Sequence, residues 1–142
     1  MKNLIVYASK HGFTQKCVDK LREELQDPAD AIRVSPRSKI FLDVYDRVMI
    51  GGSIHAGRIQ KSIRLFCQTH ESRLSDKRIG LFLCCMEEGE KAQKQFEQAF
   101  PQPLREQAVT RGFFGWGFNF QRMNMIEKTI IKKVAGVEES ME

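Results

Sequence analysis

Residues 4–14, LIVYASKHGFT, and residues 47–58, RVMIGGSIHAGR, decide the fold. In each stretch a short run of β-branched and other apolar residues ends at a segment that contains glycine. Beyond the first stretch, apolar residues recur at helical spacing over residues 14–25, and Asp27-Pro28 ends the helix. A buried strand that leads through a tight turn into a helix is typical of a parallel sheet covered by helices.

The same alternation continues along the chain. Strands are predicted over residues 2–7, 31–34, 47–51, 78–85 and 108–114, and helices over residues 14–25, 61–71, 90–100 and 126–134. Residues 37–46 form either a short helix or an irregular crossover, and residues 52–58 form a loop. The most hydrophobic strand, RIGLFLCC at 78–85, is expected at the centre of the sheet. We predict a single α/β domain over residues 1–142.

Composition agrees with such a domain. The 142 residues are 42% hydrophobic and 29% charged, so a packed core is expected and disorder is not. The N-terminus lacks the pattern of a secretory signal, and no apolar run has the length of a membrane span, so we expect a cytoplasmic protein. The four cysteines contain no CxxC pair and the three histidines share no spacing, so neither a metal site nor a disulfide framework is expected. Cys17 and Cys67 are expected as buried apolar side chains.

The turn at residues 8–14 is suited to binding an anion. It brings backbone N–H groups and the positive end of a helix dipole to one point. Ser9 and Thr14 add hydroxyl donors, and Gly12 permits close approach of the backbone. The turn matches neither the P-loop nor the dinucleotide GxGxxG motif. An ordinary strand-to-helix turn with Thr14 as the N-cap would have the same composition.

These residues resemble the flavodoxin family, whose phosphate loop has the form T/S-x-T-G-x-T. Ser9, Gly12 and Thr14 match this form, and His11 replaces the middle threonine. Residues 45–58, YDRVMIGGSIHAGR, look like the third strand and flavin loop of the flavodoxin-type, quinone-dependent protoporphyrinogen oxidases. The resemblance implies a flavodoxin-like doubly wound, five-stranded parallel sheet in the order 2-1-3-4-5 with helices on both faces. Family members carry one more terminal helix than this sequence indicates.

The resemblance also implies that FMN binds outside the carboxyl ends of the first and third strands, where the strand order reverses. The implied contacts are Ser9, Lys10, His11, Gly12, Phe13 and Thr14 with the phosphate, Ser53, Ile54, His55, Ala56, Gly57 and Arg58 with the isoalloxazine ring, and Cys85, Met86, Glu87 and Gly89 with the pyrimidine edge. The Gly57 peptide is expected near flavin N5. Arg58 is expected to raise the reduction potential, because a cation favours the anionic reduced ring. No catalytic residue is identified.

An aromatic and basic segment follows the last predicted strand. Residues 113–120, FFGWGFNF, hold five aromatic side chains, and residues 101–133 hold six Lys or Arg against two Glu. These rings either close the core and line the flavin pocket, or Phe113–Lys133 makes a peripheral contact with the inner face of the membrane. Stacking on single-stranded nucleic acid uses similar residues, but no RNP motif accompanies them, so no nucleic-acid partner is expected.

The predicted function is an FMN-binding redox protein, and three forms of it stay open. An oxidoreductase would pass electrons from an organic substrate, such as protoporphyrinogen IX, to a quinone. A one-electron carrier would exchange electrons with redox partner proteins, and a flavin-binding interaction module would have no turnover. The net charge of +5, the pI of 9.1, Arg58 and the aromatic segment favour the oxidoreductase, because carriers in this family are usually acidic.

Overall fold

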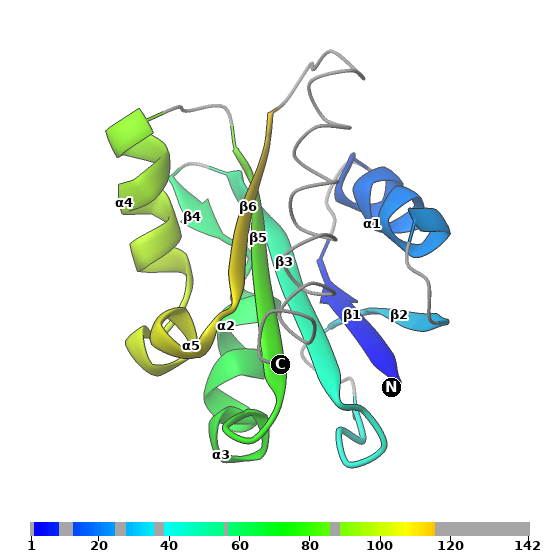
Figure 1. The fold of residues 1–142 in the computed structure, drawn as a ribbon. Helices are drawn as coiled ribbons and strands as arrows, with labels where there is room; N and C mark the ends of the chain where they lie inside the picture. The colour runs from blue at the N-terminus through cyan, green and yellow to red at the C-terminus, as the bar shows by residue number, and fades with distance from the viewer. Residues whose placement is uncertain are drawn as a thin grey trace, which may run out of the picture.

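A computed structural model describes residues 2–8, 13–24, 28–35, 39–55, 57–85 and 89–115 (Figure 1). The strands are β1 (Asn3–Tyr7), β2 (Ala29–Arg33), β3 (Arg47–His55), β4 (Arg58–Ile59), β5 (Arg78–Cys85) and β6 (Thr110–Gly115). The helices are α1 (Phe13–Glu24), α2 (Lys61–Thr69), α3 (Glu71–Leu74), α4 (Gly89–Ala99) and α5 (Gln102–Gln107). Helices separate β1 from β2, β4 from β5 and β5 from β6, as the hydrophobic pattern predicts, whereas β2 leads to β3 without a described helix between them.

Five parallel strands form the sheet in the order β2-β1-β3-β5-β6, and the short β4 pairs antiparallel with β3 (Figure 1). Without β4 this is the order 2-1-3-4-5, so the predicted flavodoxin-like, doubly wound sheet is confirmed. β3 rather than β5 lies at the centre of the sheet. The hydrophobic character of β5 arises because β5 also has a neighbour on each side, and helices cover sheet faces of this kind.

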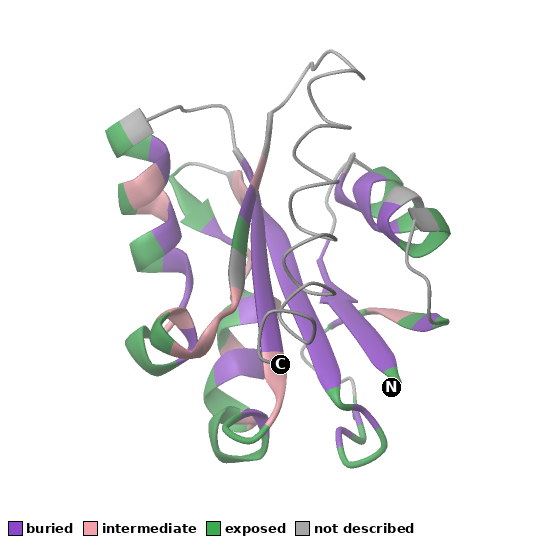
Figure 2. Ribbon diagram, viewed as in Figure 1, coloured by how far each residue is buried: buried purple, intermediate pink, exposed green. Residues whose placement is uncertain are grey.

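Helices cover both faces of the sheet. Helix α1 packs on one face, where Val18 and Leu21 join Ile5 and Met49 in one core cluster. Helices α2–α5 lie on the opposite side (Figure 1), and their apolar residues join alternate residues of the same strands in a second cluster. Figure 2 shows the interior strands buried along most of their length. The apolar side chains along the inner sides of α2 and α4 are buried: Ile63, Phe66, Cys67, Ala92, Phe96 and Ala99.

The prediction of a loop over residues 52–58 was wrong, because β3 continues to His55 and turns back into β4. The pair Gly51-Gly52 was interpreted as the end of the strand. Within the sheet, these glycines make room for neighbouring side chains. A Cβ at Gly51 would lie 2.1 Å from the ring of Phe82, and one at Gly52 would lie 2.7 Å from Oε1 of Gln60.

The crossover before β3 and the segment between α4 and β6 contain little regular structure that the sequence predicts. The crossover between β2 and β3 has no helix over residues 39–46 and buries Ile40 and Leu42, so the irregular alternative is confirmed for these residues. Helix α5 was not predicted, because Pro101 was interpreted only as the end of α4. Pro101 caps α5, and Pro103 lies in the first turn, where its missing N–H leaves no intrahelical bond unmade. The predicted helix at 126–134 lies outside the described residues.

The described cysteines are packing residues. Cys17, Cys67 and Cys84 are fully buried, and none of the three is in a disulfide. Burial raises the pKa of the Cys67 thiol to about 12, so this thiol remains protonated at neutral pH. The predicted role of Cys17 and Cys67 as buried apolar side chains is therefore confirmed. Among the helices in the described ranges, none combines the length and the apolar character needed to cross a bilayer.

Tyr45 joins the crossover to the edge of the sheet. Its hydroxyl donates a hydrogen bond to Oδ2 of Asp30 in β2 at 2.6 Å, and its backbone carbonyl accepts one from Nζ of Lys77 at 2.7 Å. The hydrogen bond to Asp30, with a further contribution from burial, raises the pKa of the Tyr45 phenol to about 12. Because the folded-state pKa exceeds the unfolded value of about 10, the protonated phenol stabilises the fold below pH 10.

We expect the stabilisation by Tyr45 to be lost as the pH rises from about 10 to about 12. Tyr45→Phe is expected to lower the free energy of unfolding by about 1 kcal/mol at neutral pH, because it removes one hydrogen bond to a carboxylate. It should also remove part of the decline in stability between those pH values. Urea unfolding at pH 7 and at several alkaline pH values tests this. If the free energies of unfolding of the wild type and of Tyr45→Phe changed in parallel with pH, this expectation would be contradicted.

Candidate functional site

The carboxyl ends of β1, β3 and β5 lie next to one another at one edge of the sheet (Figure 1). After β1 the chain passes to α1 on one face, and after β3 it passes through β4 to α2 on the other face. The strand order therefore reverses between β1 and β3. In open α/β sheets, ligands bind outside the carboxyl ends of the strands at this kind of reversal. This edge is the candidate site.

The β3–β4 hairpin projects from this edge. Ile54 pairs with Ile59 and His55 pairs with Arg58, and the turn contains Gly57 with a φ of +78°. Among the described residues, and leaving out the two chain neighbours of Gly57, no atom lies within 4 Å of the position that a Cβ at Gly57 would take, so the tip is open on that side. Arg58 is exposed, whereas Ile59 is buried and anchors the returning strand. The hairpin therefore presents peptide groups and a cation at an open tip above a packed base.

A single glutamine holds the base of this hairpin. The backbone N–H of Ser53 donates to Oε1 of Gln60 at 2.9 Å. In turn, Nε2 of Gln60 donates to Oγ of Ser53 at 2.7 Å and to the carbonyl of Ala8, just after β1, at 3.5 Å. The amide thereby connects the ends of β1 and β3. The sequence analysis missed Gln60, because an isolated glutamine belongs to no binding motif.

Thr14 lies in the first turn of α1 and is buried. Its hydroxyl lies 3.5 Å from Sγ of Cys84, so it joins the start of α1 to the end of β5. The first N–H groups of a helix have no acceptor within the helix. The described geometry therefore presents these backbone donors, next to the end of β1, as the groups suited to a phosphate. Contact between the Thr14 hydroxyl and a phosphate stays a prediction.

Several predicted contact residues lie outside the described residues, namely Ser9, Lys10, His11, Gly12, Ala56, Met86 and Glu87. The backbones of Phe13, His55, Cys85 and Gly89 are described, and each begins or ends an element at the candidate edge. Ser53, Ile54, Gly57 and Arg58 all belong to the hairpin and its base. The structure thus brings the described members of the three predicted contact segments to the same edge of the sheet.

The aromatic segment is described only through residue 115. Phe113 is half-buried and packs against Phe96, with 5.5 Å between the ring centroids. This first ring therefore closes the core, as one of the sequence-based alternatives states. The rest of the segment Phe113–Lys133 lies outside the described residues.

The described residues at this edge fit a flat, anionic cofactor. The hairpin base is packed and hydrogen-bonded, and the tip at Gly57 is open. Residues 53–60, SIHAGRIQ, include the exposed cation Arg58 and contain no carboxylate. The N-terminus of α1 adds the positive end of a helix dipole. Open peptide groups suit the edge of a flavin ring, and the positive potential suits its phosphate.

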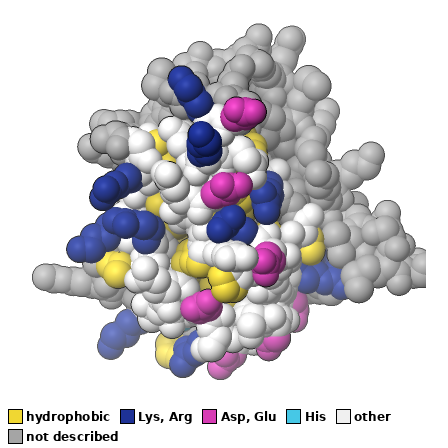
Figure 3. Space-filling model, turned by 90° about the vertical axis from the view of Figure 1, so that its left-hand side faces the viewer, with side chains coloured by type: hydrophobic (Ala, Val, Ile, Leu, Met, Phe, Trp, Pro, Cys, Tyr) yellow, Lys and Arg dark blue, Asp and Glu magenta, His cyan; other side chains and the backbone are white. Residues whose placement is uncertain are grey.

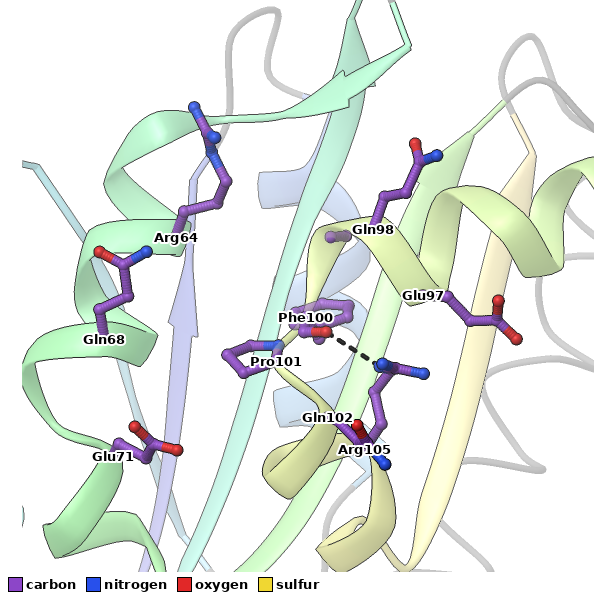
Figure 4. Close-up of a pocket in the computed structure, with 10 residues that line it drawn as sticks. Arg64, Gln68, Glu71, Glu97, Gln98, Phe100, Pro101, Gln102 and Arg105 are labelled. Carbon is purple, nitrogen blue, oxygen red and sulfur yellow. Dashed lines mark hydrogen bonds between the residues drawn. The ribbon is translucent and has the colours of Figure 1, made fainter.

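A separate groove of about 440 Å³ lies on the face of the sheet that α2–α5 cover, between α2–α3 and α4–α5 (Figure 4). Arg64 and Glu71 line one wall, and Glu97 and Arg105 line the other. Nε of Arg105 is already bound to the carbonyl of Phe100 at 3.0 Å. Figure 3 shows basic and acidic side chains interspersed over this face. Because both signs of charge line the groove, its electrostatics select no class of ligand.

Proteins similar to this chain include a dehydrogenase, a flavodiiron protein and a flavodoxin. The protoporphyrinogen IX dehydrogenase (quinone) of Escherichia coli strain K12 is 32% identical over 78 residues, which are 53% of this chain and 43% of that protein. The flavodiiron core of Flv1 from Synechocystis sp. PCC6803 has a TM-score of 0.72 at 14% identity, over 99% of this chain and 36% of that one. Oxidised flavodoxin 1 from Bacillus cereus has a TM-score of 0.67 at 15% identity, over 95% of this chain and 98% of that one.

The match to the dehydrogenase thus spans less than half of that protein's length, and the two structural matches are similarities of fold. The model of the flavodoxin domain matches residues 4–141, almost the whole chain. The strand order, the position of the reversal between β1 and β3, and this match agree. The chain belongs to the flavodoxin domain family.

Proposed function

We propose that this protein binds FMN at the carboxyl ends of β1 and β3 and transfers electrons through it. The observation that carries the proposal is the convergence of the α1 N-terminus and the β3–β4 hairpin at the reversal of strand order. Membership of the flavodoxin domain family, whose members are flavin-binding redox proteins, supports it. Bound FMN would supply the electron-accepting ring, and the chain would position that ring and tune its charge.

The residues that would hold FMN come from three segments. The loop with Ser9, Lys10, His11 and Gly12, together with the first N–H groups of α1, would bind the phosphate. The hairpin around Gly57 would lie along the ring. The segment between β5 and α4 would meet the pyrimidine edge through its backbone. Arg58, an exposed cation of the hairpin, would face the ring.

The proposed reaction is the oxidation of an organic substrate, such as protoporphyrinogen IX, with a quinone as the electron acceptor. The partial match to the Escherichia coli protoporphyrinogen IX dehydrogenase (quinone) supports this choice, as does the basic charge of the chain. A lipid-soluble acceptor also fits a peripheral membrane contact through Phe113–Lys133. For this reaction the FMN ring would have to lie at the open edge of the sheet, and the substrate would have to reach the ring beside the hairpin.

An anaerobic reductive titration of the FMN-loaded protein tests this proposal. If it is correct, the visible spectrum passes from the oxidised to the fully reduced form with one set of isosbestic points, because electrons are taken up in pairs. Protoporphyrinogen with a quinone should then support turnover. Reduction in two separate one-electron stages, without protoporphyrinogen turnover, would contradict the dehydrogenase.

A one-electron carrier is the second candidate. The observation in its favour is the fold, which matches that of oxidised flavodoxin 1 from Bacillus cereus over 95% of this chain with a TM-score of 0.67. Such a carrier would exchange electrons with a redox partner protein. The titration above separates the two candidates, since a carrier stabilises a one-electron stage.

Arg58→Ala is expected to lower the midpoint potential of bound FMN. The exposed guanidinium favours negative charge on the reduced ring, and its removal should shift the potential by about −20 mV, the two-electron equivalent of the roughly 1 kcal/mol that a solvent-screened surface charge contributes at most. Potentiometric titration measures this shift. The matched control is Arg73→Ala, an exposed arginine in α3. Equal potentials in wild type and Arg58→Ala, or the same shift in both variants, would contradict a local effect of Arg58.

A further inference from the structure

We infer that Gln60 is a positioning residue for the flavin site. Its side-chain amide fixes the base of the β3–β4 hairpin against the end of β1, and this sets the place of the peptide at Gly57. The inference rests on the proposed binding of FMN at this edge. Gln60 would act on the flavin indirectly, through Ser53 and the backbone of the hairpin.

The hydrogen bonds use both ends of the Gln60 amide. Oε1 accepts from the N–H of Ser53, and Nε2 donates to the hydroxyl of Ser53 and to the carbonyl of Ala8. Ser53 is 1% exposed and Ala8 is 4% exposed. Buried polar groups that lose their partner carry a desolvation cost. The amide therefore satisfies groups from two neighbouring strand ends that water reaches poorly.

The position of Gln60 in the chain indicates that its side chain serves the sheet and not the helix. Gln60 is the N-cap of α2, and its carbonyl accepts from the N–H of Ile63 at 3.1 Å. Ser, Thr, Asp and Asn are the preferred N-cap residues, because their short side chains bind the first N–H groups. Gln60 makes no side-chain cap hydrogen bond. A longer amide at this position is explained by its reach to Ser53 and Ala8.

Gly52 provides the space for this arrangement. A Cβ at Gly52 would lie 2.7 Å from Oε1 of Gln60 and 3.0 Å from the side chain of Ile59. The amide can thus lie against the backbone of β3. The hairpin is held at its base and open at Gly57, so its orientation toward a bound ring is fixed before binding. Preorganisation of this kind increases affinity, because less ordering remains to be done on binding.

The experiment compares Gln60→Met with Gln107→Met. Methionine has a similar length and forms none of the amide's hydrogen bonds. Gln107 is the matched control: it too is half-buried, and its Nε2 donates to the carbonyls of Leu74 and Lys77 at 2.6 Å each, where β5 begins. Both variants are expected to unfold at lower urea concentration. Titration with FMN is expected to show about tenfold weaker binding for Gln60→Met, as loss of roughly one net hydrogen bond implies, and unchanged binding for Gln107→Met.

The visible spectrum and midpoint potential of bound FMN should change in Gln60→Met and stay constant in Gln107→Met, because only Gln60→Met displaces the β3–β4 hairpin. If Gln60→Met does not fold, Ser53→Ala removes only the hydroxyl partner, and about threefold weaker FMN binding is expected. Unchanged affinity and spectrum in the folded Gln60 variant, or in Ser53→Ala where that variant replaces it, would overturn the inference. Equal weakening by Gln107→Met would also overturn it. Failure of the wild type to bind FMN would instead overturn the proposed function on which the inference rests.

Discussion

Gly51→Ala is expected to lower the free energy of unfolding by about 3 kcal/mol, at the upper end of the usual cost of overpacking a core. The added Cβ would lie 2.1 Å from two ring carbons of Phe82 and 2.3 Å from a third. Phe82 is 1% exposed, and Gly51 is paired with Tyr7 on one side and with Phe82 on the other. The strand cannot move away from the ring without disturbing its pairing with both neighbours.

Urea unfolding of Gly51→Ala, Phe82→Leu and the double variant measures this clash. The loss caused by Gly51→Ala should be much smaller when Phe82 is already leucine, which gives a coupling energy of about 1–3 kcal/mol. Gly57→Ala is a useful comparison, because its added Cβ meets no atom of a described, non-neighbouring residue within 4 Å, and its expected cost of about 1 kcal/mol comes from the positive φ. Additive losses in the double variant would show that Phe82 is not the cause.

Phe96→Ala is expected to cost about 3–5 kcal/mol, because it creates a cavity beneath α4. The ring of Phe96 is fully buried, and its centroid lies 5.0 Å from that of Phe100 and 5.5 Å from that of Phe113. It therefore joins α4 to β6. The guanidinium of Arg111 lies 5.0 Å from the same ring and covers its outer side.

Chemical unfolding of Phe96→Ala and Phe41→Ala tests the importance of this ring. Phe41 is 78% exposed, so its truncation should change the free energy of unfolding by no more than about 0.5 kcal/mol. A loss below about 1 kcal/mol in Phe96→Ala would mean that the neighbouring rings refill the space, and it would contradict the account of a tightly packed contact.

The order of strands and helices follows from the sequence, because its signals are local. Alternating apolar runs identify the five parallel strands, and the helical spacing of Ile63 and Phe66 identifies the buried side of α2. The glycine pair at 51–52 misled the prediction of β3. Glycine ordinarily indicates a turn, whereas here it accommodates Phe82 and Gln60, which come from later parts of the chain.

The candidate site was predictable to the extent that it depends on motifs. Residues 53–55, Gly57 and Arg58 lie with the start of α1 at one edge, which is where the resemblance to flavodoxins predicts FMN to bind. The role of Gln60 depends on a fold-dependent approach of Ala8, 52 positions away in the chain, to the base of the hairpin. Sequence spacing carries no signal for such a contact.

The proposed FMN site lies at the carboxyl ends of β1 and β3, where the strand order reverses. Its most direct test is a titration of the cofactor-free protein with FMN and, separately, with riboflavin, followed by flavin fluorescence. We expect saturable binding of one FMN per chain and much weaker binding of riboflavin, because the helix N-terminus and the adjacent loop bind the phosphate. Absence of saturable FMN binding would contradict the account, and equal affinities for the two flavins would contradict the proposed phosphate site.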